Sequence, residues 1–234
     1  GYKPDEFSLC YEKWLELLHP DDREKAGKEV LKQIISEEKK FSIEFRYLTK
    51  NNSWIWINGR GKVIRNDENG NPLYIIGTHT DITYRKIAEN ALRESEEKYR
   101  KVVETSSEGI ILQDDKFIIH TLNPAAERIL GIKAEKIINK SSFDEKWQIF
   151  DEKNKLVPIE KHPSTITLTT GKPCKNVILK VIRADKSYSW INVNTKPIFT
   201  ENNNKPALVV ITLSDITERK FSEEALKNLA SPSY

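Results

Sequence analysis

The sequence lacks most of the features that mark secreted, metal-binding or membrane-spanning proteins. It contains no methionine, and its two cysteines, Cys10 and Cys174, lie far apart without CxxC spacing. This pattern argues against a disulfide framework or a thiolate metal site, so we expect no bound metal and a reducing, cytoplasmic location. No apolar run approaches the ~20 residues that span a bilayer, so we expect no membrane contact within these residues.

An excess of charge of one sign is also missing. The 38 Lys and Arg residues face 35 Asp and Glu residues, which gives a formal net charge of +3, and neither sign forms a long block. Nucleic-acid binding is therefore not expected. With 38% hydrophobic and 31% charged residues, the chain has the composition of a globular protein that can bury a core.

A six-residue phrase is present twice. The stretch "DITYRK" begins at Asp81 and "DITERK" begins at Asp215, an offset of 134 residues because 215 − 81 = 134. At this offset residues 41–92 align without a gap, with 17 identities in 52 positions, among them Trp56 with Trp190. Internal repeats of this kind indicate two homologous structural units.

Each copy predicts three antiparallel strands followed by a helix. In the first copy residues 41–48, 53–65 and 72–83 are rich in β-branched and aromatic residues, and turn-forming residues separate them. Residues 174–183, 188–199 and 207–217 repeat the pattern. From Tyr84 onward the period changes to that of a helix, with a narrow seam suited to packing against another helix at Ala88, Leu92, Ser95, Tyr99 and Val102.

The repeated phrase lies where a strand must pass into a helix. The hydroxyls of Thr83 and Thr217 are placed to cap the first N–H groups of the helices. Each phrase also sets an Asp four residues before an Arg, which predicts an ion-pair clasp across the joint. One interpretation is an ordinary cap with an exposed ion pair, and the other is a joint that transmits strain from sheet to helix. The second interpretation involves Asp81, Thr83, Arg85, Asp215, Thr217 and Arg219.

With these residues the chain resembles the PAS family of sensor modules, whose carboxyl-terminal segment ends in D-I-T-x-R-K. The second unit also resembles PAS domains in "EGIILQDDKFIIHTLNPAAERILGI", with a helix start at Asn123, and in "HPSTITLTTGKP" at His162. In the first unit "LHPDDREKAGKEVLKQI", from Leu18, is similar to the long helix of another PAS subtype. The resemblance implies an α+β fold in which a five-stranded antiparallel sheet carries helices on one face and encloses a small cavity.

The first copy departs from this pattern at its start. "GYKPDEF" at Gly1 aligns with "GIKAEKI" at Gly131, so about 33 residues of the first unit, including two strands, have no counterpart. We expect a three-stranded first sheet with an exposed edge, from a domain that a neighbour completes or that is cut from a longer chain. The expected organisation is a first PAS domain at 1–83, a linking helix at 84–105, a second PAS domain at 106–217 and an outgoing helix and tail at 218–234.

Candidate ligand contacts follow from the resemblance. We consider His79, Asn123 and His162 as residues of a ligand cavity, and His162 is the candidate axial ligand if the cavity holds haem. Flavin photochemistry is not expected, because neither cysteine lies in the motif of the flavin-binding PAS subgroup. The identity of any cofactor stays open, although a small-molecule ligand is compatible with the fold.

No nucleophile with a base, paired carboxylates or metal-ligand cluster is evident, so the fragment is not expected to be an enzyme. We interpret the chain as a sensory and relay fragment of a multidomain signalling protein. The expected parent is a sensor histidine kinase, because that is the most frequent parent of such modules. Expected partners are a downstream output domain and a second copy bound through the seam at Ala88, Leu92, Tyr99 and Val102. The alternatives are a cofactor-binding sensor, for example of haem, and a pure dimerisation scaffold.

Overall fold

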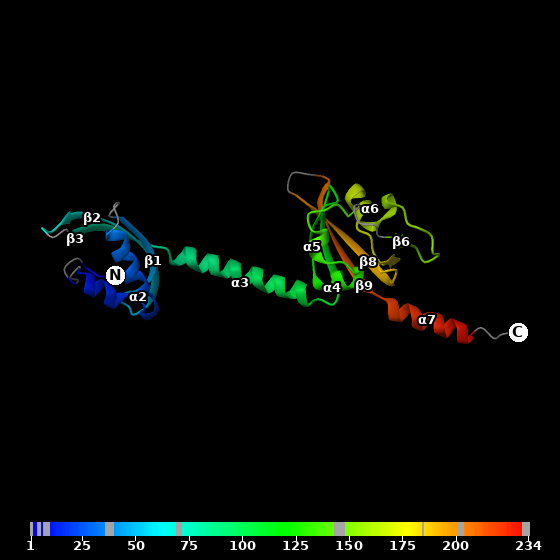
Figure 1. Cartoon of the computed structure of the whole chain (residues 1–234), viewed down its shortest axis with the longest axis horizontal. Coiled ribbons are helices and arrows are strands. Elements are labelled where there is room, and N and C mark those ends of the chain that lie inside the picture. The colour runs from blue at the N-terminus through cyan, green and yellow to red at the C-terminus, as the bar shows by residue number, and fades with distance from the viewer. Residues whose placement is uncertain are drawn as a thin grey trace. The chain divides into compact units, whose positions relative to one another are not determined.

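The computed structural model describes residues 2–3, 6, 10–35, 40–68, 72–142, 148–183, 185–200 and 204–230. The chain divides into two compact units, Gly1–Glu96 and Glu97–Tyr234, and Figure 1 shows that each unit has its own β-sheet. The two-copy α+β architecture expected from the repeat is therefore confirmed.

The first unit is a three-stranded antiparallel sheet with two helices. The helices are α1 (Tyr11–Leu17) and α2 (Pro20–Ile35), and the strands β1 (Lys40–Leu48), β2 (Trp54–Asn66) and β3 (Pro72–Asp81) lie in that order. Alternate residues of β1 and one side of α2 meet in a core, as the period-2 and period-3.6 patterns require. The buried core residues are Leu18, Ala26, Val30, Ile34, Ile43, Phe45, Ile57 and Val63.

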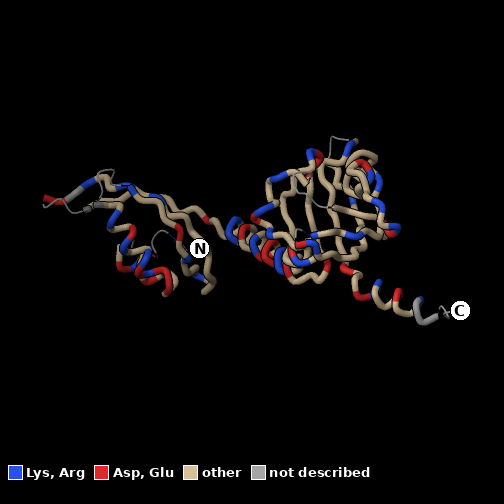
Figure 2. Tube along the Cα trace, turned by 45° about the vertical axis from the view of Figure 1, so that its right-hand side comes forward, with Lys and Arg blue, Asp and Glu red and all other residues tan. Residues whose placement is uncertain are grey.

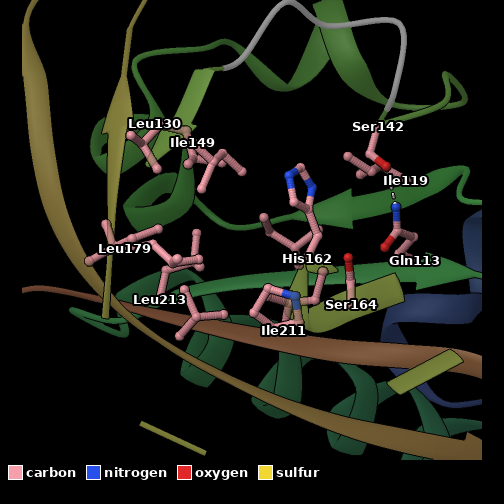
Figure 3. Close-up of a pocket in the computed structure, with 15 residues that line it drawn as sticks. Gln113, Ile119, Leu130, Ser142, Ile149, His162, Ser164, Leu179, Ile211 and Leu213 are labelled. Atoms are coloured by element: carbon pink, nitrogen blue, oxygen red, sulfur yellow. Dashed lines mark hydrogen bonds between the residues drawn. The ribbon is translucent and has the colours of Figure 1, made fainter. Parts of the chain in front are cut away.

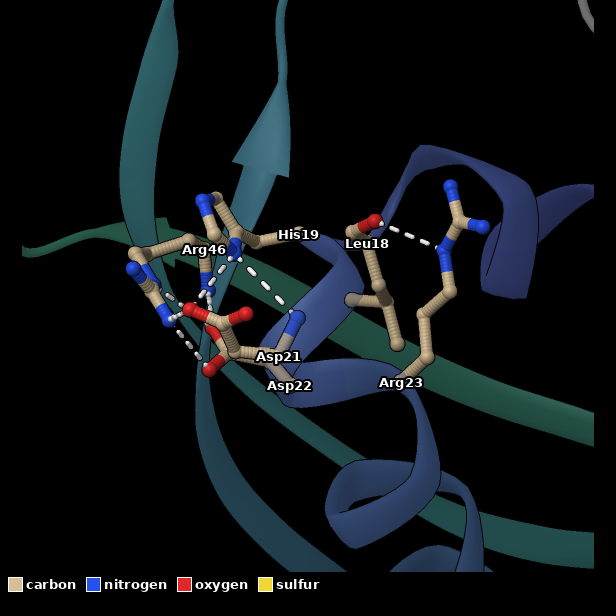
Figure 4. A network of polar contacts seen from close by, with 6 residues as sticks. All are labelled: Leu18, His19, Asp21, Asp22, Arg23 and Arg46. Atoms are coloured by element: carbon tan, nitrogen blue, oxygen red, sulfur yellow. Dashed lines mark hydrogen bonds and ion pairs between the residues drawn. The ribbon is translucent and has the colours of Figure 1, made fainter.

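The outer edge of β1 is closed by the start of α2 (Figure 4). The backbone N–H of Arg46 donates to Asp22 Oδ2 at 2.9 Å, and the Arg46 carbonyl accepts from the His19 N–H at 2.9 Å. The Arg46 guanidinium also binds Asp22, with Nη2 2.8 Å from Oδ1. These charge-assisted bonds hold the pKa of the Asp22 carboxyl below its usual value. A strand edge that would otherwise offer free backbone groups is thereby occupied.

The opposite edge, on β3, has no strand partner among the described residues. Leu73, Tyr74, Ile75 and Ile76 are all exposed, at 51%, 56%, 47% and 62%. The predicted exposed edge of an incomplete first sheet is therefore present in the described part of the chain. Such an apolar edge is a site at which another strand can add.

The second unit contains a complete sheet with helices against one face. Its strands lie in the order β5-β4-β9-β8-β7-β6. The sheet has six strands where five were expected, because a three-residue strand, β6, adds to the edge formed by β7. The strands are β4 (Gly109–Asp114), β5 (Ile119–Leu122), β6 (Gln148–Phe150), β7 (Val177–Ile182), β8 (Tyr188–Phe199) and β9 (Pro206–Asp215).

The helices of the second unit are α4 (Pro124–Leu130), α5 (Ala134–Ile137), the 3-10 turn η2 (Ile159–Lys161) and α6 (Pro163–Thr170). Ala126, Ile129 and Leu130 of α4 and Ile137 of α5 pack on inward residues of the sheet, including Ile191 and Val193. Close approach of α4 to β4 requires Gly109, since a Cβ there would lie 2.9 Å from the Ala126 Cα. The apolar core thus sits between these helices and one face of the sheet.

Each sheet continues into a helix. Helix α3 (Thr83–Thr105) follows β3, and α7 (Thr217–Ala230) follows β9. The expectation of a continuous helix between Tyr84 and Val102 is confirmed. No residue of α3 is buried, and Figure 2 shows residues of both charge signs along it. None of the helices in the described parts of the chain is long and apolar enough to cross a membrane.

Candidate functional site

The two strand-to-helix joints have the same backbone geometry. In the first, the Ile82 N–H donates to the Trp56 carbonyl at 2.9 Å, and the Trp56 N–H donates to Thr83 Oγ1 at 2.9 Å. In the second, the Ile216 N–H donates to the Trp190 carbonyl at 2.8 Å, and the Trp190 N–H donates to Thr217 Oγ1 at 3.0 Å. Each threonine therefore ties the first residue of its helix to the central strand of its sheet.

The helix starts are capped by the aspartates. Asp81 Oδ1 accepts from the Thr83 N–H at 2.8 Å, and Asp215 Oδ1 accepts from the Thr217 N–H at 2.9 Å. Hydrogen bonds from the Thr83 side chain and backbone lower the pKa of Asp81. The prediction that the threonine hydroxyls cap the helices is therefore wrong. Each hydroxyl instead accepts a hydrogen bond from the backbone N–H of a tryptophan on the neighbouring strand.

The predicted clasp between Asp81 and Arg85, and its equivalent in the second joint, is wrong. Arg85 pairs with Glu89, with Nη1 3.0 Å from Oε1. Arg219 pairs with Glu223, with Nε 2.8 Å from Oε1. Each arginine thus pairs with the i,i+4 glutamate of its own helix, and Arg85 Nη2 also lies 2.5 Å from Glu44 Oε1 on β1.

Two cationic side chains approach the ring of a tryptophan at each joint. Lys86 and Arg46 approach the Trp56 ring at 5.2 and 5.6 Å from its centroid. Lys220 and Lys180 approach the Trp190 ring at 5.5 and 5.9 Å. Cation–π attraction at these distances favours both contacts. Lysines in the first turns of α3 and α7 thus cover the two tryptophan rings, and Trp190 is buried.

The acidic partners of the two lysines differ. Lys86 Nζ lies 2.6 Å from Glu44 Oε2, on β1 of the first sheet. Lys220 Nζ lies 2.7 Å from Glu152 Oε1, just after β6. Sequence reasoning missed both glutamates. The repeat gives no signal for Glu152, because the position equivalent to Glu44 is Ile178.

The second unit contains a partly open cavity of about 80 Å³ between the sheet and the helices (Figure 3). Its walls are mainly aliphatic, and four lining residues are polar: Gln113, Ser142, His162 and Ser164. His162 Nε2 is 3.2 Å from the Val157 carbonyl oxygen. Burial lowers the pKa of His162 more than this bond and the nearby Glu160 raise it. Burial therefore favours the neutral form of the ring.

The other two residues considered for the cavity do not line it. Asn123 uses its amide to hold backbone: Oδ1 accepts from the Ile110 and Ala126 N–H groups, and Nδ2 donates to the Val103 and Glu108 carbonyls. It acts as the N-cap of α4.

His79 lies in the first unit, edge-on to the rings of Phe45 and Tyr47 at 5.6 and 5.7 Å. These rings withdraw part of the His79 ring from water, which lowers the pKa of His79, while burial raises the pKa of Tyr47 to about 12. An edge-to-face aromatic cluster accounts for these contacts.

Haem does not fit the cavity beside His162. Sites for drug-sized ligands have volumes of roughly 300–1,000 Å³, whereas this cavity has about 80 Å³. Among the described residues no group of three or more His, Cys, Asp or Glu could hold a metal ion.

Neutral His162 makes the second unit sensitive to acid. Because its pKa is lowered in the folded protein, the unfolded chain binds more protons just below pH ~6.5, the ordinary histidine value. The free energy of unfolding is therefore expected to fall as the pH drops through this range. Urea unfolding of His162→Gln at pH 5 and pH 7.5 should show a smaller difference than the parent chain. The exposed His120→Gln serves as the control, and an unchanged difference in His162→Gln would contradict the assignment.

Two family models match the chain. One, described as "PAS fold", matches residues 1–79, and the other, described as "PAS domain", matches residues 107–218. The chain is a tandem pair of PAS domains. Domains of this family are sensory modules, and the matched regions account for the three- and six-stranded sheets described above.

Curated relatives of the chain include a sensor protein and a kinase. The chain is 34% identical over 121 residues to "Sensor protein FixL" of Bradyrhizobium diazoefficiens, and the match covers 52% of this chain and 24% of that protein. It is 42% identical over 64 residues to "Sporulation kinase E" of Bacillus subtilis, and this match covers 27% of this chain and 9% of that protein. The chain therefore spans about a quarter or less of the length of these relatives.

Among solved structures, the chain resembles a "Sensory Box Histidine Kinase/Response Regulator" from Burkholderia thailandensis. The two are 33% identical, with a TM-score of 0.36, and the match covers 43% of this chain and 73% of that one.

Proposed function

We propose that this chain is the sensory and relay part of a multidomain sensor histidine kinase, in which the second PAS domain passes the state of its cavity to α7. The parent class is supported by the kinases among its relatives. The observation that carries the relay is the pair formed by Glu152 and Lys220, which ties the edge of the sheet beside the cavity to the first turn of α7.

The path from cavity to helix is short. Ile149 of β6 lines the cavity, and Glu152 follows the end of this three-residue strand. Lys220 contacts both Glu152 and the Trp190 ring. A ligand or a partner that displaces β6 would therefore change the position of the Lys220 side chain and the tilt of α7. A helix biased between two packings in this way is a two-state element.

The joint of the first PAS domain differs in the element that its lysine contacts. Glu44 lies within β1, a nine-residue strand of the sheet, so Lys86 and Arg85 bind the sheet directly. We propose that this domain passes strain to α3 through β1 rather than through a short added strand such as β6. In this scheme residues 1–83 and 106–217 are the two domains, 84–105 is the linking helix, and 218–234 leads to a downstream output domain in the cytoplasm.

The relay is tested by hydrogen exchange at α7. Replacing Glu152 by Gln removes the charge that holds Lys220, so amide exchange in the first turns of α7 is expected to rise about two- to fivefold. Exchange in β7 and β8 should stay unchanged. Mass spectrometry of the whole chain measures both, with Glu160→Gln as a control that alters a nearby carboxylate. Equal exchange of α7 in both variants would refute the relay path.

Dimerisation is the second candidate function, and the exposed seam of α3 favours it. Leu92, Tyr99 and Val102 are exposed at 62%, 70% and 62%, and Ala88 lies on the same seam. Four residues at spacings of 4, 7 and 3 form an apolar stripe that a second copy can cover.

Placing a charge in this stripe should separate the copies. The double variant Leu92→Asp and Tyr99→Asp is expected to weaken self-association of the chain in sedimentation experiments, because each carboxylate would be desolvated in the seam. Circular dichroism should show both domains still folded. Asn90→Asp, on the opposite side of α3, adds one charge outside the seam and should leave the dimer intact. Association of the double variant as strong as that of the unaltered chain would contradict assembly through α3.

A further inference from the structure

The cavity of the second PAS domain contains a buried hydrogen-bond acceptor that no described residue satisfies. Gln113 is 1% exposed, and its Oε1 atom has no hydrogen-bond partner within the described part of the chain. Buried polar atoms in folded proteins are nearly always satisfied, and leaving one unpaired is costly. Gln113 also lines the cavity, and Figure 3 shows its oxygen on the side of the cavity that faces His162.

The orientation of the Gln113 amide follows from its other contacts. Nε2 donates to the Phe117 carbonyl at 3.1 Å and to Ser142 Oγ at 2.6 Å. A carbonyl oxygen can only accept, so the amide nitrogen must face Phe117. The free atom is therefore an acceptor, and whatever satisfies it must be a donor.

The other polar lining residues indicate which further chemical groups a bound ligand can carry. The Val157 carbonyl near His162 Nε2 requires a proton on that nitrogen, which leaves Nδ1 of the neutral ring as a second acceptor. Ser164 supplies a hydroxyl on the same wall (Figure 3). None of the described lining residues carries a carboxylate or an ammonium group, so burial of a charged ligand would be uncompensated.

We propose that this cavity binds a small uncharged alcohol whose hydroxyl donates a hydrogen bond to Gln113 Oε1. The alkyl part lies against aliphatic side chains of the sheet, among them Ile111, Leu179 and Leu213. An amine would be protonated near neutral pH and is excluded by the uncharged wall. The role of this alcohol as the input to α7 rests on the proposed function, whereas its binding does not.

The size of the cavity limits the alcohol to a few atoms. An apolar cavity of roughly 150 Å³ accepts benzene, with six non-hydrogen atoms, and this cavity has about 80 Å³. The ligand therefore has about three or four non-hydrogen atoms. For so small a molecule we expect a dissociation constant of about 1–10 mM.

The test compares propan-2-ol with acetone, which has the same number of non-hydrogen atoms but no donor. Methyl NMR of the whole chain is recorded during titration with each compound up to about 50 mM. We expect saturable shifts of the Ile111, Leu179 and Leu213 methyl groups with propan-2-ol, and about two- to tenfold weaker binding of acetone. Equal affinities for propan-2-ol and acetone would overturn the proposal. Shifts that rise linearly without saturation would also overturn it, because they would mean that the alcohol does not bind and that the cavity holds only water.

The variant Gln113→Met removes the acceptor while keeping a side chain of similar length. Its affinity for propan-2-ol is expected to fall to that of acetone. Nuclear Overhauser contacts between propan-2-ol and the Gln113 amide protons of the unaltered chain test the same contact without a variant, and their absence at saturation would refute it. Binding that leaves exchange at α7 unchanged would contradict the relay but not the ligand class.

Discussion

Replacing Trp190 by alanine is expected to lower the free energy of unfolding of the second PAS domain by about 3–5 kcal/mol. The Trp190 side chain is 8% exposed, and Lys180 and Lys220 both approach its ring. Its removal would leave a cavity under the first turn of α7 and deprive both lysines of their cation–π contact. Calorimetry of the whole chain should show a lower midpoint for the transition of the second domain and an unchanged transition for the first.

Trp56→Ala is the matched control, because repeat symmetry places Trp56 at the same point of the first joint. Trp56 is only half-buried, so the expected loss for the first domain is less than half as large. Trp190→Phe, which keeps an aromatic face for the lysines, should recover part of the stability. Equal losses in the two domains would show that burial of Trp190 does not determine the effect.

The repeated sequence was enough to predict two domains and the place of each joint. Seventeen identities over 52 positions defined the strands and the helix start in both copies, and local periodicity predicted the helix from Tyr84. These features depend on short-range patterns, which one sequence displays directly.

The chemistry of the joints could not be predicted in the same way. The spacing of Asp81 and Thr83 was compatible with several hydrogen-bond schemes, and the true partner of Thr83 is the backbone of Trp56, 27 positions away. That contact depends on the pairing of β2 with β3, in which Ile57 faces Asp81. Strand register is a tertiary property, so local spacing alone does not specify it.

The missed residues of the candidate site share this origin. Gln113 belongs to β4, and nothing in "EGIILQDD" distinguishes its buried amide from an exposed one. Glu152 reaches Lys220 across 68 positions. The sixth strand is only three residues long, which is too short for a periodic signal.

Association through the free edge of β3 is the second large effect that we expect. In the second domain β4 pairs with β9 over Gly109–Asp114, opposite Leu208–Leu213. The repeat offset makes the equivalent part of β3 residues 74–79, where no strand partner lies among the described residues. We expect the chain to self-associate through this apolar edge, and Ile76→Lys to weaken that association at least about tenfold, because a lysine on an edge strand opposes strand addition.

Sedimentation in the background of Leu92→Asp and Tyr99→Asp isolates this contact from the α3 seam. Ile87→Lys is the matched control, since Ile87 is 61% exposed but belongs to helix α3 and not to a sheet edge. The same substitution there adds the same charge without reaching an open strand edge. If Ile87→Lys weakens association as much as Ile76→Lys does, general surface charge is responsible and the edge of β3 is not the contact. If only Ile76→Lys acts, strand addition to β3 is the means by which the first PAS domain gains its missing sheet neighbour.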